Sequence, residues 1–228
     1  MIQMRKLIIA IDGPSGAGKG TISRAVAARM HYRHIDTGAM YRGVAWKALR
    51  EGIDLSDESA VAVLAARARF DIGEDYVRID GHDVSAAIRT AEIDAAAAAV
   101  ARQPTVRAVL IERQRAMGAG GGVVMEGRDI GTVVFPAADV KIFLDASPEE
   151  RARRRANDPA HAAGRGPSAI QEVAAALEQR DLSDRTRAAS PLVAADDAAV
   201  IDTTALSIDR AVERVMELIH GRLRSANC

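Results

Sequence analysis

The residues best suited to chemistry lie in a glycine-rich loop near the N-terminus of the 228-residue chain. The loop follows the pattern G-x-x-x-x-G-K, in which backbone N–H groups curl around phosphate oxygens and the lysine reaches the β- and γ-phosphates of a nucleotide. A strand is predicted before it and a helix after it, and a helix N-terminus adds positive potential toward an anion. The loop therefore predicts ATP binding by Gly13, Pro14, Ser15, Gly16, Ala17, Gly18, Lys19, Gly20 and Thr21, with Lys19 also catalytic.

The residue after Lys19 departs from the commonest form of this loop. That position usually carries Ser or Thr, whose hydroxyl binds Mg²⁺, but here it is Gly20, and the hydroxyl follows at Thr21. We expect Thr21 to act on Mg²⁺ indirectly, through a bound water. Glu126, at the end of a predicted strand, is a second indirect candidate, and a purely structural role for it is equally open.

Arginines and aspartates form a second group of residues with chemical potential. Arg180, Asp184 and Arg187 are spaced i, i+4 and i+7, so they share one face of a predicted helix. Two guanidinium groups beside a carboxylate can hold a phosphate and the hydroxyls of a ribose, although the spacing alone would also suit a solvated ion pair. Asp129 follows a buried strand and can accept a hydrogen bond from an exocyclic amine, and Arg128 beside it can bind a phosphate.

The elements that must position these residues are those of an α/β domain. Short β-branched runs predict buried parallel strands over residues 7–11, 123–125, 140–144 and 199–201. Helices are predicted over residues 21–30, 41–50, 59–69, 92–117 with an interruption near Pro104, 148–156 and 168–187, and Ser207 can cap a last one. Because ligands bind at the carboxyl ends of such strands, the charged residues that follow them are expected to lie near a ligand.

Two segments interrupt this pattern. Residues 71–89 alternate apolar and polar side chains and contain an Asp80-Gly81 turn, which predicts a small antiparallel insertion. Residues 157–167 are polar and contain Gly and Pro, as expected of a mobile loop. We therefore predict a single P-loop kinase domain over residues 1–228, with a parallel sheet flanked by helices. Its parts are a core (1–58, 92–150 and 169–228), an acceptor-binding insertion (59–91) and a short lid (151–168).

Composition and charge argue against several kinds of protein. The formal net charge is zero, which is unusual for a protein that coats nucleic acid. The apolar run at residues 7–11 is too short for a signal peptide or a membrane span, and Cys228 is the only cysteine. We expect a cytoplasmic monomer that binds neither nucleic acid nor membrane.

Several classes of nucleotide-binding protein share such a loop, and the rest of the chain separates them. A GTPase would need an N-K-x-D element, which the sequence lacks. Motor and transporter ATPases usually bring a further signature or a larger chain. A kinase for small molecules needs an arginine-rich acceptor site and a covering lid, and the sequence offers both. A nucleotide-binding switch that senses ATP is the alternative from a different class.

Three further segments resemble a known family: residues 36–42 (DTGAMYR), 126–132 (EGRDIGT) and 180–187 (RDLSDRTR). Together with the GKGT form of the phosphate loop, they stand in the order and spacing of bacterial-type cytidylate kinases, which are nucleoside monophosphate kinases. The resemblance runs from residue 7 to residue 219. It implies transfer of the γ-phosphoryl group of ATP, with Mg²⁺, to CMP or dCMP; another kinase, such as one that prefers UMP, is the nearest alternative.

The resemblance also implies roles for individual residues of the substrate site. The phosphate of CMP would be held by Arg42, Arg128 and Arg187. The sugar would be held by Arg180 and Asp184. The base would be read by Asp129 and Arg107, and Thr37 would complete the substrate site.

Two more consequences of the resemblance concern the lid and the base. The family has lid arginines where this chain has Arg151, Arg154 and Arg155. We predict that Arg154 and Arg155, with Lys19 and Arg128, stabilise charge on the transferring phosphoryl group. The family usually has Ser near position 98, whereas this chain has Ala98, so one hydroxyl contact to the base is expected to be missing.

Overall fold

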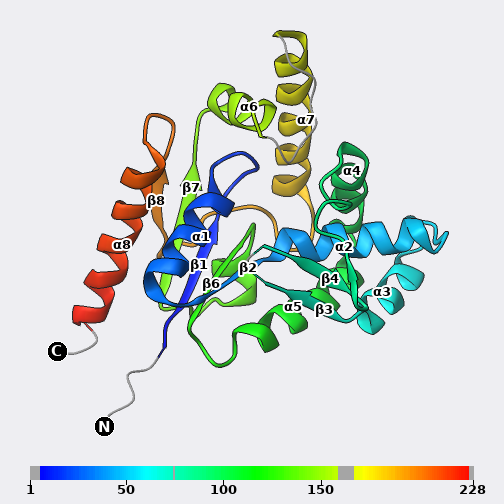
Figure 1. Ribbon diagram of the computed structural model, residues 1–228, viewed down its shortest axis with the longest axis horizontal. Coiled ribbons are helices and arrows are strands. Elements are labelled where there is room, and N and C mark those ends of the chain that lie inside the picture. Colours follow the sequence, from blue (N-terminus) through cyan, green and yellow to red (C-terminus); the bar gives the residue numbers. More distant parts are fainter. Residues whose placement is uncertain (1–5, 74, 159–166, 226–228) are drawn as a thin grey trace.

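Five parallel strands form the central sheet of the computed structural model (Figure 1), which describes residues 6–73, 75–158 and 167–225. Their order across the sheet is β2-β6-β1-β7-β8. The strands are β1 (Ile8–Asp12), β2 (Arg33–Asp36), β6 (Val123–Gly127), β7 (Val140–Asp145) and β8 (Ala199–Asp202). The predicted parallel sheet is confirmed, and β1, which leads into the phosphate loop, lies at its centre.

The register of the strands brings polar residues together at one edge of the sheet. Asp12 of β1 lies opposite Gly127 of β6, and Asp36 of β2 lies opposite Glu126 of β6. Three neighbouring strands therefore end at the same level, and each has an acidic residue at or next to its end. Open α/β sheets bind ligands beyond this edge, which places these carboxylates beside the phosphate loop.

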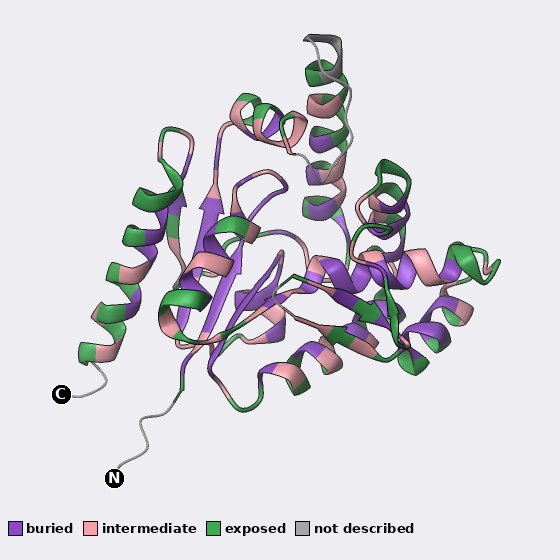
Figure 2. Ribbon diagram, in the orientation of Figure 1, coloured by how far each residue is buried: buried purple, intermediate pink, exposed green. Residues whose placement is uncertain are grey.

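Helices cover both faces of the sheet. They are α1 (Lys19–Met30), α2 (Thr37–Arg50), α3 (Glu58–Arg67), α4 (Ala91–Val100), α5 (Pro104–Gly118), α6 (Pro148–Ala156), α7 (Pro167–Thr186) and α8 (Ile208–Ser225). Ile9 and Ile11 of β1 pack in one core with α1 and α8, whereas Ala10 packs in another core that α5 borders. This alternation follows from the two-residue period of a strand. Figure 2 shows the central strands β1, β6 and β7 mostly buried and the outward faces of α7 and α8 exposed.

The predicted antiparallel insertion is also confirmed. The strands β3 (Phe70–Ile72), β4 (Val77–Ile79) and β5 (His82–Asp83) pair antiparallel in that order. Asp80 and Gly81, with φ of 51° and 84°, form the tight turn between β4 and β5, as expected where two successive residues need positive φ. Val77 and Ile79 of this small sheet pack in a hydrophobic core that is separate from those of the central sheet.

Two elements near the phosphate loop were not predicted. β2 is a four-residue edge strand, and α2 begins at Thr37 rather than at Tyr41, because Asp36 caps it by accepting a hydrogen bond from Ala39 N at 3.0 Å. A five-residue π-helix, η1 (Ile130–Val134), follows β6. Both elements depend on contacts with distant parts of the chain, which local periodicity does not show.

The remaining helices follow the expected boundaries closely. The interruption near Pro104 separates α4 from α5, with Pro104 at the first position of α5, where its missing N–H is tolerated. The predicted mobile loop of residues 157–167 lies mostly outside the described residues. Among the helices that the structure describes, none is long and apolar enough to cross a membrane.

Candidate active site

A cleft of about 940 Å³ lies at the carboxyl edge of the sheet and is lined by most of the predicted site residues. The phosphate loop, the start of α2, the end of β6 and the helices α4 to α7 all contribute to its walls. The predicted residues that line it are Ser15, Gly16, Gly18, Lys19, Gly20, Thr21, Thr37, Arg42, Arg107, Arg128, Asp129, Arg154, Arg155, Arg180, Asp184 and Arg187. Gly13, Pro14 and Ala17 belong to the loop but are not among the lining residues.

The phosphate loop has a backbone that only glycine suits at its tightest points. Gly13 has φ of 146°, and a Cβ there would lie 2.0 Å from the carbonyl oxygen of Leu144. Gly18 (φ 89°) precedes α1 and makes no side-chain cap, so the first N–H groups of the helix are left for a ligand. The loop thus presents backbone donors and a helix N-terminus to the cleft, as an anion site requires.

Lys19 lies buried at the base of the cleft. Its Nζ donates a hydrogen bond to the carbonyl oxygen of Pro14 at 2.7 Å. Burial and, to a smaller extent, the nearby charge of Arg128 lower the pKa of Lys19 to about 7, while Glu126 and Asp12 act in the opposite direction. A phosphate group beside this amine would favour its charged form.

Asp36 and Glu126 lie side by side at the ends of β2 and β6. Arg42 pairs with Asp36, with 2.7 Å between Nη2 and Oδ2. Burial alone would raise the pKa of Asp36, but Arg42 and His34 outweigh it and hold that pKa at about 2. Thr37 Oγ1 donates to the carbonyl oxygen of Glu126 at 2.7 Å, which joins α2 to the end of β6.

The side of the cleft that is predicted to bind the acceptor is a network of arginines and aspartates. Arg128 Nε lies 2.9 Å from Asp184 Oδ2, and Arg187 Nη1 lies 3.3 Å from Asp184 Oδ1. Arg187 is also 3.9 Å from Asp129, whose other oxygen pairs with the buried Arg107. The network holds three guanidinium groups in fixed directions and leaves their remaining N–H groups for an anion.

The three predicted lid arginines have different surroundings. Arg154 binds Glu150 at 2.8 Å and Thr203 at 3.0 Å, and Arg155 pairs with Asp94 on the opposite wall. Arg151 does not line the cleft. It is buried, donates to the carbonyl oxygen of Ser15 at 3.1 Å and pairs with Asp181 of α7. The structure therefore separates Arg151, which supports the phosphate loop, from the two arginines that line the cleft.

Sequence reasoning missed several residues of the site. Asp12 accepts hydrogen bonds from Ile130 N at 2.8 Å and Gly131 N at 2.7 Å, and burial raises its pKa to about 6. Asp94 lies 3.5 Å from Arg180 as well as pairing with Arg155. Of these residues, only Asp12 could have been singled out from the sequence, because it is the last residue of the strand that leads into the phosphate loop.

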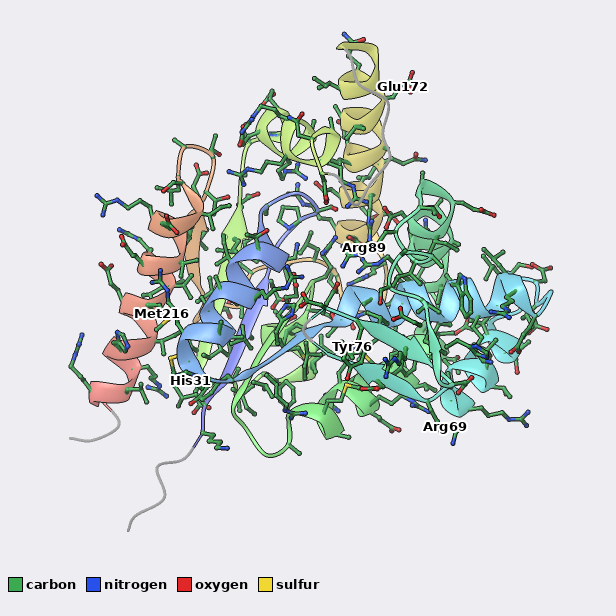
Figure 3. The ribbon with its side chains drawn as sticks, viewed as in Figure 1. His31, Arg69, Tyr76, Arg89, Glu172 and Met216 are labelled. Atoms are coloured by element: carbon green, nitrogen blue, oxygen red, sulfur yellow. The ribbon has the colours of Figure 1, made fainter. Side chains whose placement is uncertain are left out.

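Arg89 is a further arginine of the cleft wall that the sequence analysis did not single out. It comes from the segment between β5 and α4 and lines the cleft; Figure 3 shows it between the lower end of α7 and α4. Within the described part of the chain it has no ion-pair partner, whereas Arg42, Arg128 and Arg180 each have one. The cleft therefore has a strongly cationic lining.

The fold and the cleft together define a P-loop phosphotransferase of the small-molecule kinase class. A shikimate kinase from Bacteroides thetaiotaomicron shares this fold, with a TM-score of 0.50 and 13% identity over 94% of this chain and 98% of that chain.

Comparison with protein families identifies the group within that class. The chain belongs to the cytidylate kinase family, whose sequence profile matches residues 9–221. The cytidylate kinase of Solibacter usitatus (strain Ellin6076) is 45% identical over 221 residues, covering 97% of this chain and 95% of that protein. The cytidylate kinase of Pelotomaculum thermopropionicum (strain DSM 13744 / JCM 10971 / SI) is 49% identical over 222 residues, covering 95% and 97%. The resemblance stated from the four sequence motifs is confirmed.

Proposed function

We propose that the protein transfers the γ-phosphoryl group of ATP to CMP or dCMP, giving ADP and CDP or dCDP. The observation that carries this proposal is a single cleft in which the phosphate loop and Lys19 face the arginine network around Asp184. Family membership supports the same reaction, since relatives that match nearly the whole chain are named cytidylate kinases.

On the donor side, the residues act mainly through position and charge. Backbone N–H groups of the phosphate loop bind the phosphates, and Lys19 leaves Pro14 to contact the β- and γ-phosphate oxygens. Arg154 and Arg155 stabilise the charge that spreads over the transferring group. Phosphoryl transfer demands little else of a protein, because its transition state is loose and highly charged.

On the acceptor side, Arg42, Arg128 and Arg187 hold the CMP phosphate. Its attacking oxygen is already ionised at neutral pH, so the reaction needs no strong general base. Burial and, as the second cause, repulsion by Arg128 lower the pKa of Arg180 to about 10. A bound anion would relieve that repulsion, which is why this cluster suits a phosphate better than a neutral ligand.

The donor set around the loop fits Mg²⁺ that is carried by the nucleotide. No three His, Cys, Asp or Glu side chains of the described residues group into a metal site. Mg²⁺ usually keeps several waters and binds one or two carboxylates together with substrate phosphates. Glu126 and Thr21 both line the cleft and would hold such waters. Bound Mg²⁺ neutralises charge on the β- and γ-phosphate oxygens.

The predicted lid and insertion would keep water out of the cleft. Closure of the residues 151–168 and of the insertion 59–91 over the substrates would exclude water from the γ-phosphate. ATP hydrolysis without an acceptor should then be much slower than transfer. This division into core, insertion and lid, the cytoplasmic location and the monomeric state remain predictions.

The test is a coupled ADP-release assay with ATP and Mg²⁺ that compares CMP, dCMP, UMP, AMP and GMP as acceptors. We expect CMP and dCMP to be the best acceptors, and Asp129→Ala to remove that preference. Equal or better transfer to UMP would favour the alternative, which Ala98 supports because it lines the cleft without a hydroxyl. Hydrolysis that needs no acceptor would contradict the kinase proposal and favour a nucleotide switch.

A further inference from the structure

His34 contacts the carboxylate of Glu126 from the neighbouring strand. Its Nε2 lies 2.9 Å from Glu126 Oε1, and the two side chains are only 5% and 8% exposed. In the parallel register, His34 lies opposite Val124, two residues before Glu126 on the neighbouring strand. Residues two apart in a strand point to the same face, so the side chains of His34 and Glu126 lie on the same face of the sheet. Because an ionised carboxylate only accepts hydrogen bonds, the imidazole is the donor.

The backbone and the side chain of Glu126 are fixed by different partners. Thr37 Oγ1 donates to the carbonyl oxygen of Glu126 at 2.7 Å, a contact that fixes the backbone but does not orient the carboxylate. Of these two partners, His34 is the one that reaches the carboxylate. A charge-assisted hydrogen bond of this kind is among the stronger ones in proteins.

Gly20 lies beside this carboxylate, at ordinary contact distance. A Cβ at position 20 would lie 3.4 Å from Glu126 Oε1 and 3.8 Å from Oε2. The carboxylate therefore stands against the start of α1, directly after Lys19. In the commonest form of the phosphate loop, the position of Gly20 carries a Ser or Thr side chain.

The same carboxylate lies near the lysine that must bind phosphate. The charge of Glu126 raises the pKa of Lys19 against the larger effect of burial. Even so, within the described residues no ion pair joins the two, and Lys19 binds the carbonyl oxygen of Pro14. A carboxylate free to rotate would compete with the nucleotide for this cation.

We infer that His34 is a positioning residue that orients Glu126 toward the water shell of nucleotide-bound Mg²⁺ and keeps it away from Lys19. The inference rests on the proposed function for its Mg²⁺-nucleotide ligand. The sequence motifs do not include His34, and its action depends on β2 lying beside β6. It acts through Glu126 and touches no reacting atom.

Calorimetric titration with AMP-PNP, a non-hydrolysable ATP analogue, tests this inference in Mg²⁺ and in EDTA. The full-length native chain is compared with His34→Leu, which fills the space without a donor, and His34→Gln, which keeps an N–H donor. His220→Leu, on the exposed face of α8, is the matched control. Mg²⁺ increases the affinity of the native chain for AMP-PNP by some factor, and we expect this factor to be about tenfold smaller in His34→Leu. Tenfold is the lower end of the effect of removing an outer-sphere partner. His34→Gln should recover most of the Mg²⁺-dependent affinity, and affinity in EDTA should not fall by as much in any variant.

The inference would be overturned if Mg²⁺ increased the affinity for AMP-PNP by the same factor in the native protein and in His34→Leu. It would also be overturned if His34→Gln lost as much of this Mg²⁺-dependent affinity as His34→Leu. Circular dichroism checks folding, and His34→Met replaces His34→Leu if the latter does not fold. The proposed function is judged separately. A native chain that binds AMP-PNP but transfers nothing to CMP contradicts that function, whereas the Mg²⁺ comparison still decides the role of His34.

Discussion

Arg128, at the end of β6, and Asp184, on α7, form a salt bridge with 2.9 Å between Nε and Oδ2 across 56 residues of sequence. Burial alone would raise the pKa of Asp184, but Arg128 and Arg187 hold it below its usual value. One carboxylate therefore orients two arginines that belong to different elements. This relationship joins the edge of the sheet to the helix that carries the proposed acceptor-binding residues Arg180 and Asp184.

Asp184→Asn should weaken acceptor binding more than donor binding. The amide keeps the shape but removes the charge that orients Arg128 and Arg187. Since a hydrogen bond to a charged group contributes about 1.5–3 kcal/mol, we expect the KM for CMP to rise about 10- to 100-fold. The KM for ATP should change much less. Steady-state kinetics with each substrate varied in turn measure both, with Asp209→Asn on exposed α8 as control. Equal increases in the two KM values would contradict this assignment.

Lys19→Met should abolish most of the transfer while leaving acceptor binding largely intact. Methionine preserves the length of the side chain but removes the cation at the β- and γ-phosphates. Loss of one preorganised stabilising donor typically reduces kcat by about 100- to 1,000-fold. Lys6→Met, at an exposed position, is the control. A kcat for Lys19→Met within tenfold of the native value would show that Lys19 is not part of the reaction.

The same substitution should change how stability depends on pH. The ordinary pKa of a lysine, which applies to the unfolded chain, is 10.5, whereas the pKa of Lys19 in the folded chain is about 7. Between these values the unfolded chain binds a proton that the folded chain does not, so the free energy of unfolding rises with pH. Ligand-free Lys19→Met lacks this dependence, so it should be the more stable protein at pH 7, by an amount that shrinks toward pH 10. Urea unfolding at pH 7 and pH 9.5 measures the difference. A difference in the free energy of unfolding that is the same at both pH values would argue against a buried lysine with a lowered pKa.

Arg151→Met should destabilise the protein because it leaves a buried carboxylate unpaired. Arg151 pairs with Asp181, and both side chains are 7% exposed. Removing one member of a buried pair typically costs about 3–5 kcal/mol, and the free energy of unfolding from urea titration measures it. Arg210→Met breaks the exposed pair with Glu213 and should have little effect. Equal effects of the two substitutions would contradict the structural role of Arg151.

Ala98→Ser should sharpen the choice of base. Ala98 lines the cleft on α4, and a hydroxyl there adds one hydrogen-bond partner for a pyrimidine. A neutral hydrogen bond contributes about 0.5–1.5 kcal/mol, so the ratio of kcat/KM for CMP over UMP should rise about 2- to 10-fold. Ala99→Ser, on the exposed side of the same helix, is the matched control. An unchanged ratio in Ala98→Ser would mean that position 98 does not contact the base.

The sequence predicted those parts of the fold and site that depend on neighbouring residues. The phosphate loop from Gly13 to Thr21 is a continuous motif, and the turn at Asp80 and Gly81 needs a backbone that few residue pairs adopt. The face shared by Arg180 and Asp184 follows from helical spacing alone. In each of these cases the physical cause lies within about two turns of helix.

The parts that were missed depend on residues far apart in the chain. β2 was missed because its Arg33 and His34 resemble neither a buried run nor an alternating one. The pairing of Asp94 with Arg155 joins α4 to α6, and no local pattern marks it. The π-helix after Asp129 is likewise tied to Asp12, more than a hundred residues away.

A bisubstrate analogue in which adenosine and cytidine are linked through five phosphates tests the central claim, that donor and acceptor meet in one cleft. Calorimetric titration of the native chain should give one molecule bound per chain, more tightly than ATP or CMP alone, in competition with both. Lys19→Met and Asp184→Asn should each weaken that binding. Two molecules bound per chain, or competition with ATP but not with CMP, would contradict the claim.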